Sequence, residues 1–161
     1  MIKLYDRNAA VRYAARWALS RNPAYYDYSN IGGDCTNFAS QCLYAGSGVM
    51  DYTETYGWYY IDANRKAPAW TGVEFLYQYL VREEQRPGPM AVLVSKNEIQ
   101  QGDIIQLSFN GVTFGHTPVV LATRPQIFVA AHSEDSFMRP LDTYDYQAIR
   151  FLHITGVEIG S

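Results

Sequence analysis

The hydrophobic periodicity of this 161-residue chain changes once, at the breaker Arg86-Pro87-Gly88-Pro89. Before this point, apolar residues recur three and four positions apart, which is the spacing of helices with one buried face. After it, short apolar runs are separated by turn signals such as Asn110-Gly111, which is typical of antiparallel strands. The order predicts an α+β fold, with the N-terminal helices packed on a small antiparallel sheet or half-barrel.

Three helices are expected in the first half of the chain. The first spans Asp6 to Ser20, with Asp6 as its cap. The second opens at Cys35 after Asp34, which stands where an N-cap belongs, and Gly46 stands at its C-terminal cap. The third runs from Thr71 to about Arg82 and begins with a capping box. The expected strands are Ala91–Val94, Asp103–Phe109, His116–Ala122, Ile127–His132 and a last one within Ala148–Ile154.

Composition bounds the class of protein. The chain is 48% hydrophobic and 18% charged, so it is expected to fold as a single domain over residues 1–161. Its net charge of −3 argues against nucleic acid as a partner. No apolar run is long enough for a membrane span, and we expect a monomer. The first seven residues contain no signal peptide, which fits a cytoplasmic protein or an excised domain of an exported one.

The residue best suited to act as a nucleophile lies at the start of the expected second helix. Gly32-Gly33-Asp34 leads directly into Cys35, so the sulfur lies in the first turn, where unpaired N–H groups and the helix dipole favour the thiolate. Cys42 lies mid-helix on the apolar face and is expected to be a small buried hydrophobe. The two cysteines are roughly 10 Å apart along the helix, which is too far for a disulfide.

Two of the three histidines stand at expected strand ends. His116 begins one strand after a glycine, and His132 ends the next strand. A short turn between antiparallel strands can bring these ends side by side, so that His132 fixes the tautomer of His116. Glu134 and Asp135 follow His132 and could fill the same role. His153 lies within the last strand and is expected to be a satisfied, partly buried side chain.

Metal and cofactor binding are not expected. Six residues separate the cysteines and fifteen separate His116 from His132, and neither is a usual zinc-binding spacing.

Aromatic residues make up 15% of the chain, which fits either a groove for an extended polar ligand or a tyrosine-rich core. Trp58 and Trp70 are accordingly candidates for the wall of a substrate groove, with core filling as the equal alternative.

The order of cysteine, sheet, histidine and a further polar residue is that of papain-like bacterial cysteine hydrolases of the NlpC and CHAP types. More narrowly, the chain resembles the putative amidase domain family over nearly its whole length. The specific segment is Asp34-Cys35-Thr36-Asn37-Phe38-Ala39-Ser40-Gln41, and the supporting segments are Asp6 to Ala14, Asn22 to Tyr25, Gly57-Trp58, Pro68 to Thr71, Gly102 to Gln106, Gly115-His116 and Ala131 to Asp135.

The resemblance implies cleavage of an amide bond, with cell-wall peptides as the substrate class of the wider superfamily. It implies Cys35 as nucleophile, His116 as base and a third polar residue on the next strand, here His132. In such a mechanism the Cys35 N–H is one oxyanion donor, and Asn30 or Tyr28 supplies the other. The alternatives are a non-catalytic binding module on the same fold, an acyltransferase or transglutaminase that passes the thioester to an amine, and a zinc-dependent structural domain.

Overall fold

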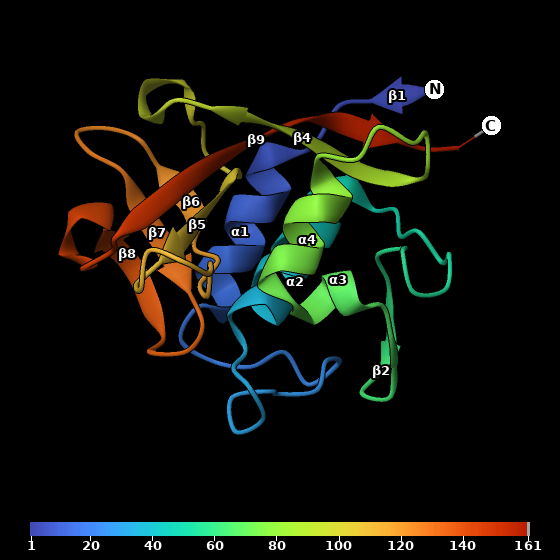
Figure 1. Ribbon diagram of the computed structural model, residues 1–161, viewed down its shortest axis with the longest axis horizontal. Helices are drawn as coiled ribbons and strands as arrows, with labels where there is room; N and C mark the ends of the chain where they lie inside the picture. The colour runs from blue at the N-terminus through green and yellow to red at the C-terminus, as the bar shows by residue number, and fades with distance from the viewer. Residues whose placement is uncertain (161) are drawn as a thin grey trace.

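The computed structural model describes residues 1–160. The helices are α1 (Arg7–Trp17), α2 (Cys35–Ser47), α3 (Pro68–Thr71) and α4 (Val73–Leu80), with short 3-10 turns at Lys96–Glu98 and Leu141–Thr143. The strands are β1 (Ile2–Lys3), β2 (Tyr60–Asp62), β3 (Arg65–Lys66), β4 (Gly88–Val94), β5 (Ile104–Ser108), β6 (Val119–Ala122), β7 (Phe128–Ala131), β8 (Ser136–Pro140) and β9 (Ala148–Glu158). The helices precede most of the strands, as the change of periodicity predicts (Figure 1).

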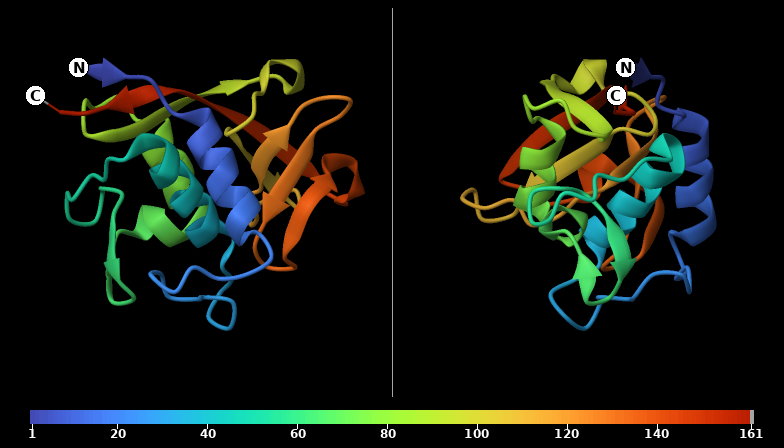
Figure 2. Two further views of the ribbon diagram at one scale, coloured as in Figure 1. Left: turned by 180° about the vertical axis from the view of Figure 1, so that it is seen from behind. Right: turned by 90° about the vertical axis from the view of Figure 1, so that its right-hand side faces the viewer.

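Seven strands form one antiparallel sheet. Its order is β1-β9-β5-β6-β7-β8, and β4 pairs with the long strand β9 as well. The sheet curls into a half-barrel, with helices α1, α2 and α4 packed together against it (Figures 1 and 2). The predicted α+β fold is therefore confirmed. Strands β2 and β3 form a separate hairpin; these two strands, β1 and β8 were not expected from the sequence.

Both faces of the central strands are buried. Val119 and Ala130 lie in the apolar cluster that joins the sheet to the helices, whereas their neighbours Val120 and Val129 lie in a second cluster on the opposite face. Successive side chains of a strand alternate between faces. The face on which a residue of β6 or β7 lies therefore decides whether it can reach helix α2.

The first helix begins as the sequence predicts, and the second ends differently. The Asp6 carboxylate accepts a hydrogen bond from the Ala9 N–H at 3.0 Å, as an N-cap should. Helix α2 continues past Gly46 to a cap at Gly48, whose φ of 68° is left-handed. Gly46 instead lies against the Tyr5 ring and the Asp6 backbone, where a side chain would collide. It is a packing glycine rather than the predicted cap.

The capping box predicted at Thr71 is wrong. Thr71 ends α3, Gly72 precedes α4, and the helix spans only Val73–Leu80. The Glu74 carboxylate pairs with the Arg150 guanidinium at 3.0 Å rather than reaching back to the start of the helix. Glu74 therefore forms an ion pair with a residue distant in sequence instead of the cap hydrogen bond expected from the local sequence.

Of the two equal alternatives for Trp58 and Trp70, the structure contradicts the lining of a substrate groove. Both are fully buried, and their ring centres lie 4.8 Å apart in the core. Each indole N–H is satisfied from α2, since Trp58 donates to the Ser40 hydroxyl at 3.0 Å and Trp70 donates to the Asn37 amide oxygen at 2.9 Å. The alternative of core filling holds. No helix within residues 1–160 is long and apolar enough to cross a membrane.

Candidate active site

Cys35 is the first residue of α2 and lies against Gly115, in the segment between β5 and β6. Its Sγ is 3.8 Å from the Gly115 carbonyl oxygen and 3.7 Å from the Thr36 hydroxyl oxygen. The residue is 8% exposed, in contrast to Cys42, which is fully buried. The sulfur thus has two polar neighbours and a small exposed area, which distinguishes it from the fully buried Cys42.

The expected thiolate is not the resting form of Cys35. Burial raises the pKa of this thiol, and the Asp34 carboxylate raises it further. Hydrogen bonds from the Thr36 hydroxyl and from the Thr36 and Thr117 backbones act in the opposite direction, but burial is the larger effect. The position at a helix N-terminus does not overcome this desolvation. Cys35 is therefore a thiol at neutral pH and requires a base to become a nucleophile.

His116 directly follows Gly115, whose carbonyl contacts Cys35, but the His116 ring faces the other side of the sheet. It pairs across the strands with Leu107, which belongs to the second apolar cluster, so both side chains lie on the face away from the helices. Its Nε2 is 3.4 Å from the Tyr144 hydroxyl oxygen. Gly115 connects the two candidates, because its carbonyl contacts Cys35 while the residue lines a pocket with His116.

This pocket has a volume of about 430 Å³. Its lining joins residues of β8 and of three turns, namely Phe109, Gly115, His116, Ser133, Glu134, Arg139, Thr143, Tyr144 and Asp145. Burial lowers the pKa of His116 to about 4, and the charge of Arg139 contributes in the same direction. The imidazole is therefore neutral at physiological pH, which is the form that can accept a proton.

His132 occupies a different environment, and the expectation that it steers His116 is corrected. Its Nδ1 is 2.6 Å from the Asp34 carboxylate and its Nε2 is 2.8 Å from the Trp17 carbonyl oxygen. The ring stacks on Phe38 of α2, with 4.1 Å between ring centres. Strand alternation explains this, because the β6–β7 register places His132 opposite Thr117, on the helix-facing side, rather than opposite His116.

Asp34 is the centre of a buried polar cluster directly before the nucleophile candidate. Besides the His132 ring, its carboxylate accepts hydrogen bonds from the Tyr28 N–H at 2.8 Å and from the Asn37 side-chain amide at 2.9 Å. Its own N–H donates to the Ser133 hydroxyl at 3.1 Å. Asp34 is the N-cap by position but makes no side-chain cap bond. Its carboxylate instead joins the loop before α2 to the end of β7.

The two acidic alternatives for the third residue lie on the turn after β7. The Asp135 carboxylate is bound by both terminal nitrogens of Arg21, at 2.7 and 3.0 Å. The Glu134 side chain is 90% exposed and lies 3.9 Å from Arg139 Nη1. Ser133 and Glu134 both have a φ of 56°, which is uncommon for residues other than glycine. Neither acidic residue has His116 among its hydrogen-bonding partners within residues 1–160.

The two oxyanion candidates are placed differently. Asn30 is exposed in the loop before α2. Tyr28 is buried, and its hydroxyl donates to the Ala63 carbonyl at 3.1 Å. The Tyr28 hydroxyl is therefore engaged in this structure, whereas Asn30 lies on the accessible side of the loop.

Three further polar residues have structural partners, and for His153 this confirms the expectation of a satisfied, partly buried side chain. The Asn37 side chain donates to the Tyr26 carbonyl at 2.9 Å, which ties α2 to the preceding loop. Gln41 accepts a hydrogen bond from the Tyr13 hydroxyl, which ties α2 to α1. The His153 Nδ1 lies 2.9 Å from the Asp103 carboxylate.

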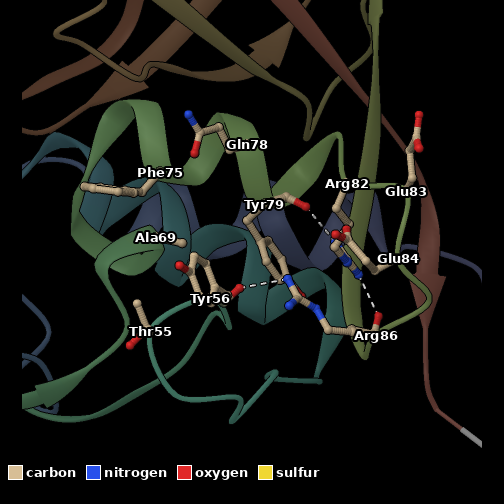
Figure 3. A pocket seen from close by; sticks show the side chains of 10 residues that line it. All are labelled: Thr55, Tyr56, Ala69, Phe75, Gln78, Tyr79, Arg82, Glu83, Glu84 and Arg86. Carbon is tan, nitrogen blue, oxygen red and sulfur yellow. Dashed lines mark hydrogen bonds between the residues drawn. The ribbon is translucent and has the colours of Figure 1, made fainter.

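A second pocket, of about 580 Å³, lies along α4 and contains neither Cys35 nor a histidine (Figure 3). Figure 3 shows the guanidinium groups of Arg82 and Arg86 beside the Tyr79 ring. Their terminal nitrogens donate to backbone carbonyls, including Tyr79 and Tyr56 at 2.9 and 2.8 Å. These arginines cap the end of α4 and fix a loop. Because this pocket contains no candidate nucleophile or base, the candidate active site is the one at His116.

Sequence reasoning missed three residues of the site. Tyr144 is the hydrogen-bonding partner of His116, Arg139 stacks on Tyr144 with 3.6 Å between the guanidinium carbon and the ring centre, and Ser133 bonds the backbone of Asp34. That His116 and Thr117 face opposite sides of the sheet could have been predicted, because successive side chains of an extended segment alternate between faces. The turn that brings Tyr144 to His116 has no comparable sequence pattern.

Comparison with known proteins supports the family and little more. The family described as "Putative amidase domain" matches residues 4–155. A curated relative, the "Uncharacterized protein YhbB" of Bacillus subtilis (strain 168), is 37% identical over 141 residues. That match covers 84% of this chain but only 43% of the relative, so the chain spans less than half of that protein's length. No solved structure matches the chain significantly.

Proposed function

The chain belongs to the putative amidase domain family, and from that premise we propose that it hydrolyses amide bonds by a cysteine-dependent mechanism. The family suggests an amidase-type hydrolase at most. The observation that carries the cysteine mechanism is the position of Cys35, a slightly exposed thiol at a helix start, 3.8 Å from the carbonyl of the residue that precedes His116. Acyl transfer requires at least a nucleophile and a base, and in this proposal Cys35 and the neutral imidazole of His116 supply them from either side of Gly115.

We infer that the reaction begins from a neutral pair. Nδ1 of His116 is the proton acceptor in this proposal, because Nε2 is directed to Tyr144. The ring faces away from helix α2 in this structure, so a bridging water molecule or a rotation of the ring is needed to carry the thiol proton of Cys35 to it. The sulfur then attacks the amide carbonyl carbon, forming the C–S bond as the carbonyl oxygen takes the negative charge. Collapse of this intermediate breaks the C–N bond, and the imidazolium gives its proton to the leaving amine. A thioester and a neutral His116 remain.

Water completes the cycle on the same residues. His116 takes a proton from a water molecule as the water oxygen attacks the thioester carbonyl. The C–S bond breaks, the carboxylic acid leaves, and the sulfur of Cys35 recovers its proton. In this proposal the backbone N–H of Cys35 is one oxyanion donor, and Asn30 is preferred over Tyr28 as the other because the Tyr28 hydroxyl is bound to Ala63.

In this proposal Tyr144 rather than His132 orients the base. A neutral imidazole that donates from Nε2 to the Tyr144 oxygen keeps its lone pair on Nδ1. His132 acts through Asp34 and holds the loop that carries Cys35. We also propose, from the resemblance to the NlpC and CHAP types of cysteine hydrolase, that the fold is papain-like and that the substrates are cell-wall peptides.

Alkylation by iodoacetamide at neutral pH tests the nucleophile directly. Cys35 should label although its thiol is buried and its pKa is raised, and His116→Ala should slow the labelling by at least tenfold, because the proton acceptor is lost. The fully buried Cys42 is the internal control and should stay unlabelled in the folded protein. Labelling of Cys35 at the rate of an unfolded-chain thiol, unchanged in His116→Ala, would contradict the proposal and leave the non-catalytic binding module as the better reading.

Product analysis separates hydrolysis from acyl transfer. Isolated cell-wall peptides are incubated with the protein, with and without an added primary amine. A hydrolase yields the free acid in both reactions, whereas an acyltransferase yields a new amide when the amine is present. Cys35→Ala is the matched inactive control, and it should yield neither product.

A further inference from the structure

The pocket beside His116 contains a guanidinium that the proposed reaction does not use. Arg139 comes from β8, and its side chain is 26% exposed. It lines the same pocket as His116. Its guanidinium carbon lies 3.6 Å from the centre of the Tyr144 ring, the ring whose hydroxyl contacts His116. This stacking and the bonds described next fix the cation in place before any ligand arrives.

The guanidinium has donors to spare. Nε donates to the Thr143 hydroxyl at 2.7 Å, and Nη2 donates to the Thr143 carbonyl at 3.2 Å. An arginine has five N–H donors, so others remain. Nη1 lies 3.9 Å from the Glu134 carboxylate, which is beyond hydrogen-bonding distance, and Glu134 is 90% exposed. An exposed, loose pair of this kind contributes little, so an arriving carboxylate can displace it.

We propose that Arg139 binds a carboxylate of the substrate, so that the preferred amides carry an acidic group near the bond that is cut. This proposal rests on the amide-hydrolase function and adds the substrate's charge to it. A planar guanidinium recognises a carboxylate through two parallel hydrogen bonds. The second carboxylate of the pocket, that of Asp145, is exposed; together with Glu134 it disfavours anions that do not reach Arg139.

A bound carboxylate would also act on the base. The groups of the pocket that bear on His116 are Arg139, Tyr144 and the carboxylates of Glu134 and Asp145. Arg139 is the charge that disfavours the imidazolium. A substrate carboxylate on Arg139 offsets this charge, which raises the pKa of His116 and makes it a better proton acceptor. Acidic substrates are therefore expected to react faster in the chemical step as well as to bind more tightly.

Matched alkylating reagents test the subsite without knowledge of the natural substrate. Iodoacetyl-glycine and iodoacetyl-glycinamide have the same size and leaving group and differ only in a carboxylate. In each reaction the sulfur of Cys35 forms a C–S bond, iodide leaves and the thiol proton passes to His116. The wild-type protein should react faster with the acid than with the amide, by about fivefold to tenfold, the effect of one charge-assisted hydrogen bond at a partly exposed site.

Three variants identify the source of this preference. Arg139→Gln should bring the ratio of the two rates close to one, whereas Arg139→Lys should keep part of the preference because the charge remains. Arg12→Gln changes the net charge equally at an exposed position on α1 and should leave the ratio unchanged. An equal loss in the Lys and Gln variants, or an unchanged ratio in Arg139→Gln, would overturn the proposal.

A binding measurement separates failure of this proposal from failure of the proposed function. In Cys35→Ala, which cannot react, the imidazole signals of His116 are followed by NMR as acetyl-glycine or acetyl-glycinamide is added. The acid should raise the pKa of His116 and the amide should not, and Arg139→Gln should abolish the difference. A shift in this experiment without fast alkylation of Cys35 would support the subsite and contradict the hydrolase. Equal behaviour of the two ligands would overturn the subsite alone.

Discussion

His116, which precedes β6, and His132, which directly follows β7, have opposite surroundings. His132 is 1% exposed, and its ring nitrogens lie 2.6 and 2.8 Å from oxygen acceptors. His116 lines an open pocket and has one weaker partner, the Tyr144 hydroxyl at 3.4 Å. A fully bonded ring has no lone pair or proton to exchange with a substrate, whereas a poorly bonded one has. The comparison therefore shows His132 as a bonded part of the fold, and it is His116 that the proposed mechanism uses for proton transfer.

The largest effect is expected from replacing His116, which tests whether this histidine is the general base. His116→Gln should lower the rate of amide hydrolysis by about a thousandfold, the usual contribution of a general base, with little loss of stability. His153→Gln removes a partly exposed histidine of another strand and is the matched control. Initial rates and thermal unfolding of both variants provide the measurement. A normal rate of hydrolysis in His116→Gln would show that another residue is the general base.

His132 should show the reverse pattern. His132→Leu leaves the buried Asp34 carboxylate without its closest partner, and the free energy of unfolding should fall by about 3 kcal/mol. Asp34→Asn should cost a similar amount, and the double variant should cost less than the sum, because the two side chains interact directly at 2.6 Å. Urea unfolding of the four proteins measures this coupling. Additive losses would show that the pair does not join α2 to β7.

Acid sensitivity sharpens the comparison further. The pKa of His116 is about 4 in the folded protein and 6.5 as the ordinary value, so between these pH values the unfolded chain binds a proton that the folded protein does not. The stability contributed by the neutral ring is present above pH 6.5 and is lost as the pH falls toward 4, by about 3 kcal/mol in full. His116→Gln should lack this part of the pH dependence. Unfolding curves at pH 7 and pH 4.5 compare the two proteins, and parallel losses would contradict the assignment.

Sequence reasoning predicted what depends on local pattern. The Asp6 cap, the helix that opens at Cys35 and the hairpin between β5 and β6 follow from residue spacing and turn chemistry, and the structure contains each of them. The burial of Cys42 followed from its place on the apolar face of α2. The α+β class followed in the same way, because one change of periodicity separates the helices from most of the strands.

What the sequence did not predict depends on contacts between distant segments. Strand ends can be placed from a pattern, but the face on which a ring lies depends on the exact register, and a shift of one residue separates His116 from His132. The capping role of Glu74 was lost to Arg150, and the state of Cys35 was decided by burial rather than by the helix start. Tyr144 reaches His116 across 28 residues through a turn that no periodicity marks.

The smallest expected effect tests whether Tyr144 is a positioning residue for the base. Tyr144→Phe keeps the ring under Arg139 but removes the hydroxyl oxygen that contacts His116 Nε2. Alkylation of Cys35 and hydrolysis should slow by about threefold to tenfold, the cost of one neutral hydrogen bond. Because loosened packing could also slow both reactions, the ¹⁵N shifts of the imidazole provide the decisive readout. A wild-type ring should carry its proton on Nε2, and the variant should show a mixture of tautomers. An unchanged tautomer would mean that Tyr144 only packs against His116, and that the orientation of this histidine comes from the strand that holds it.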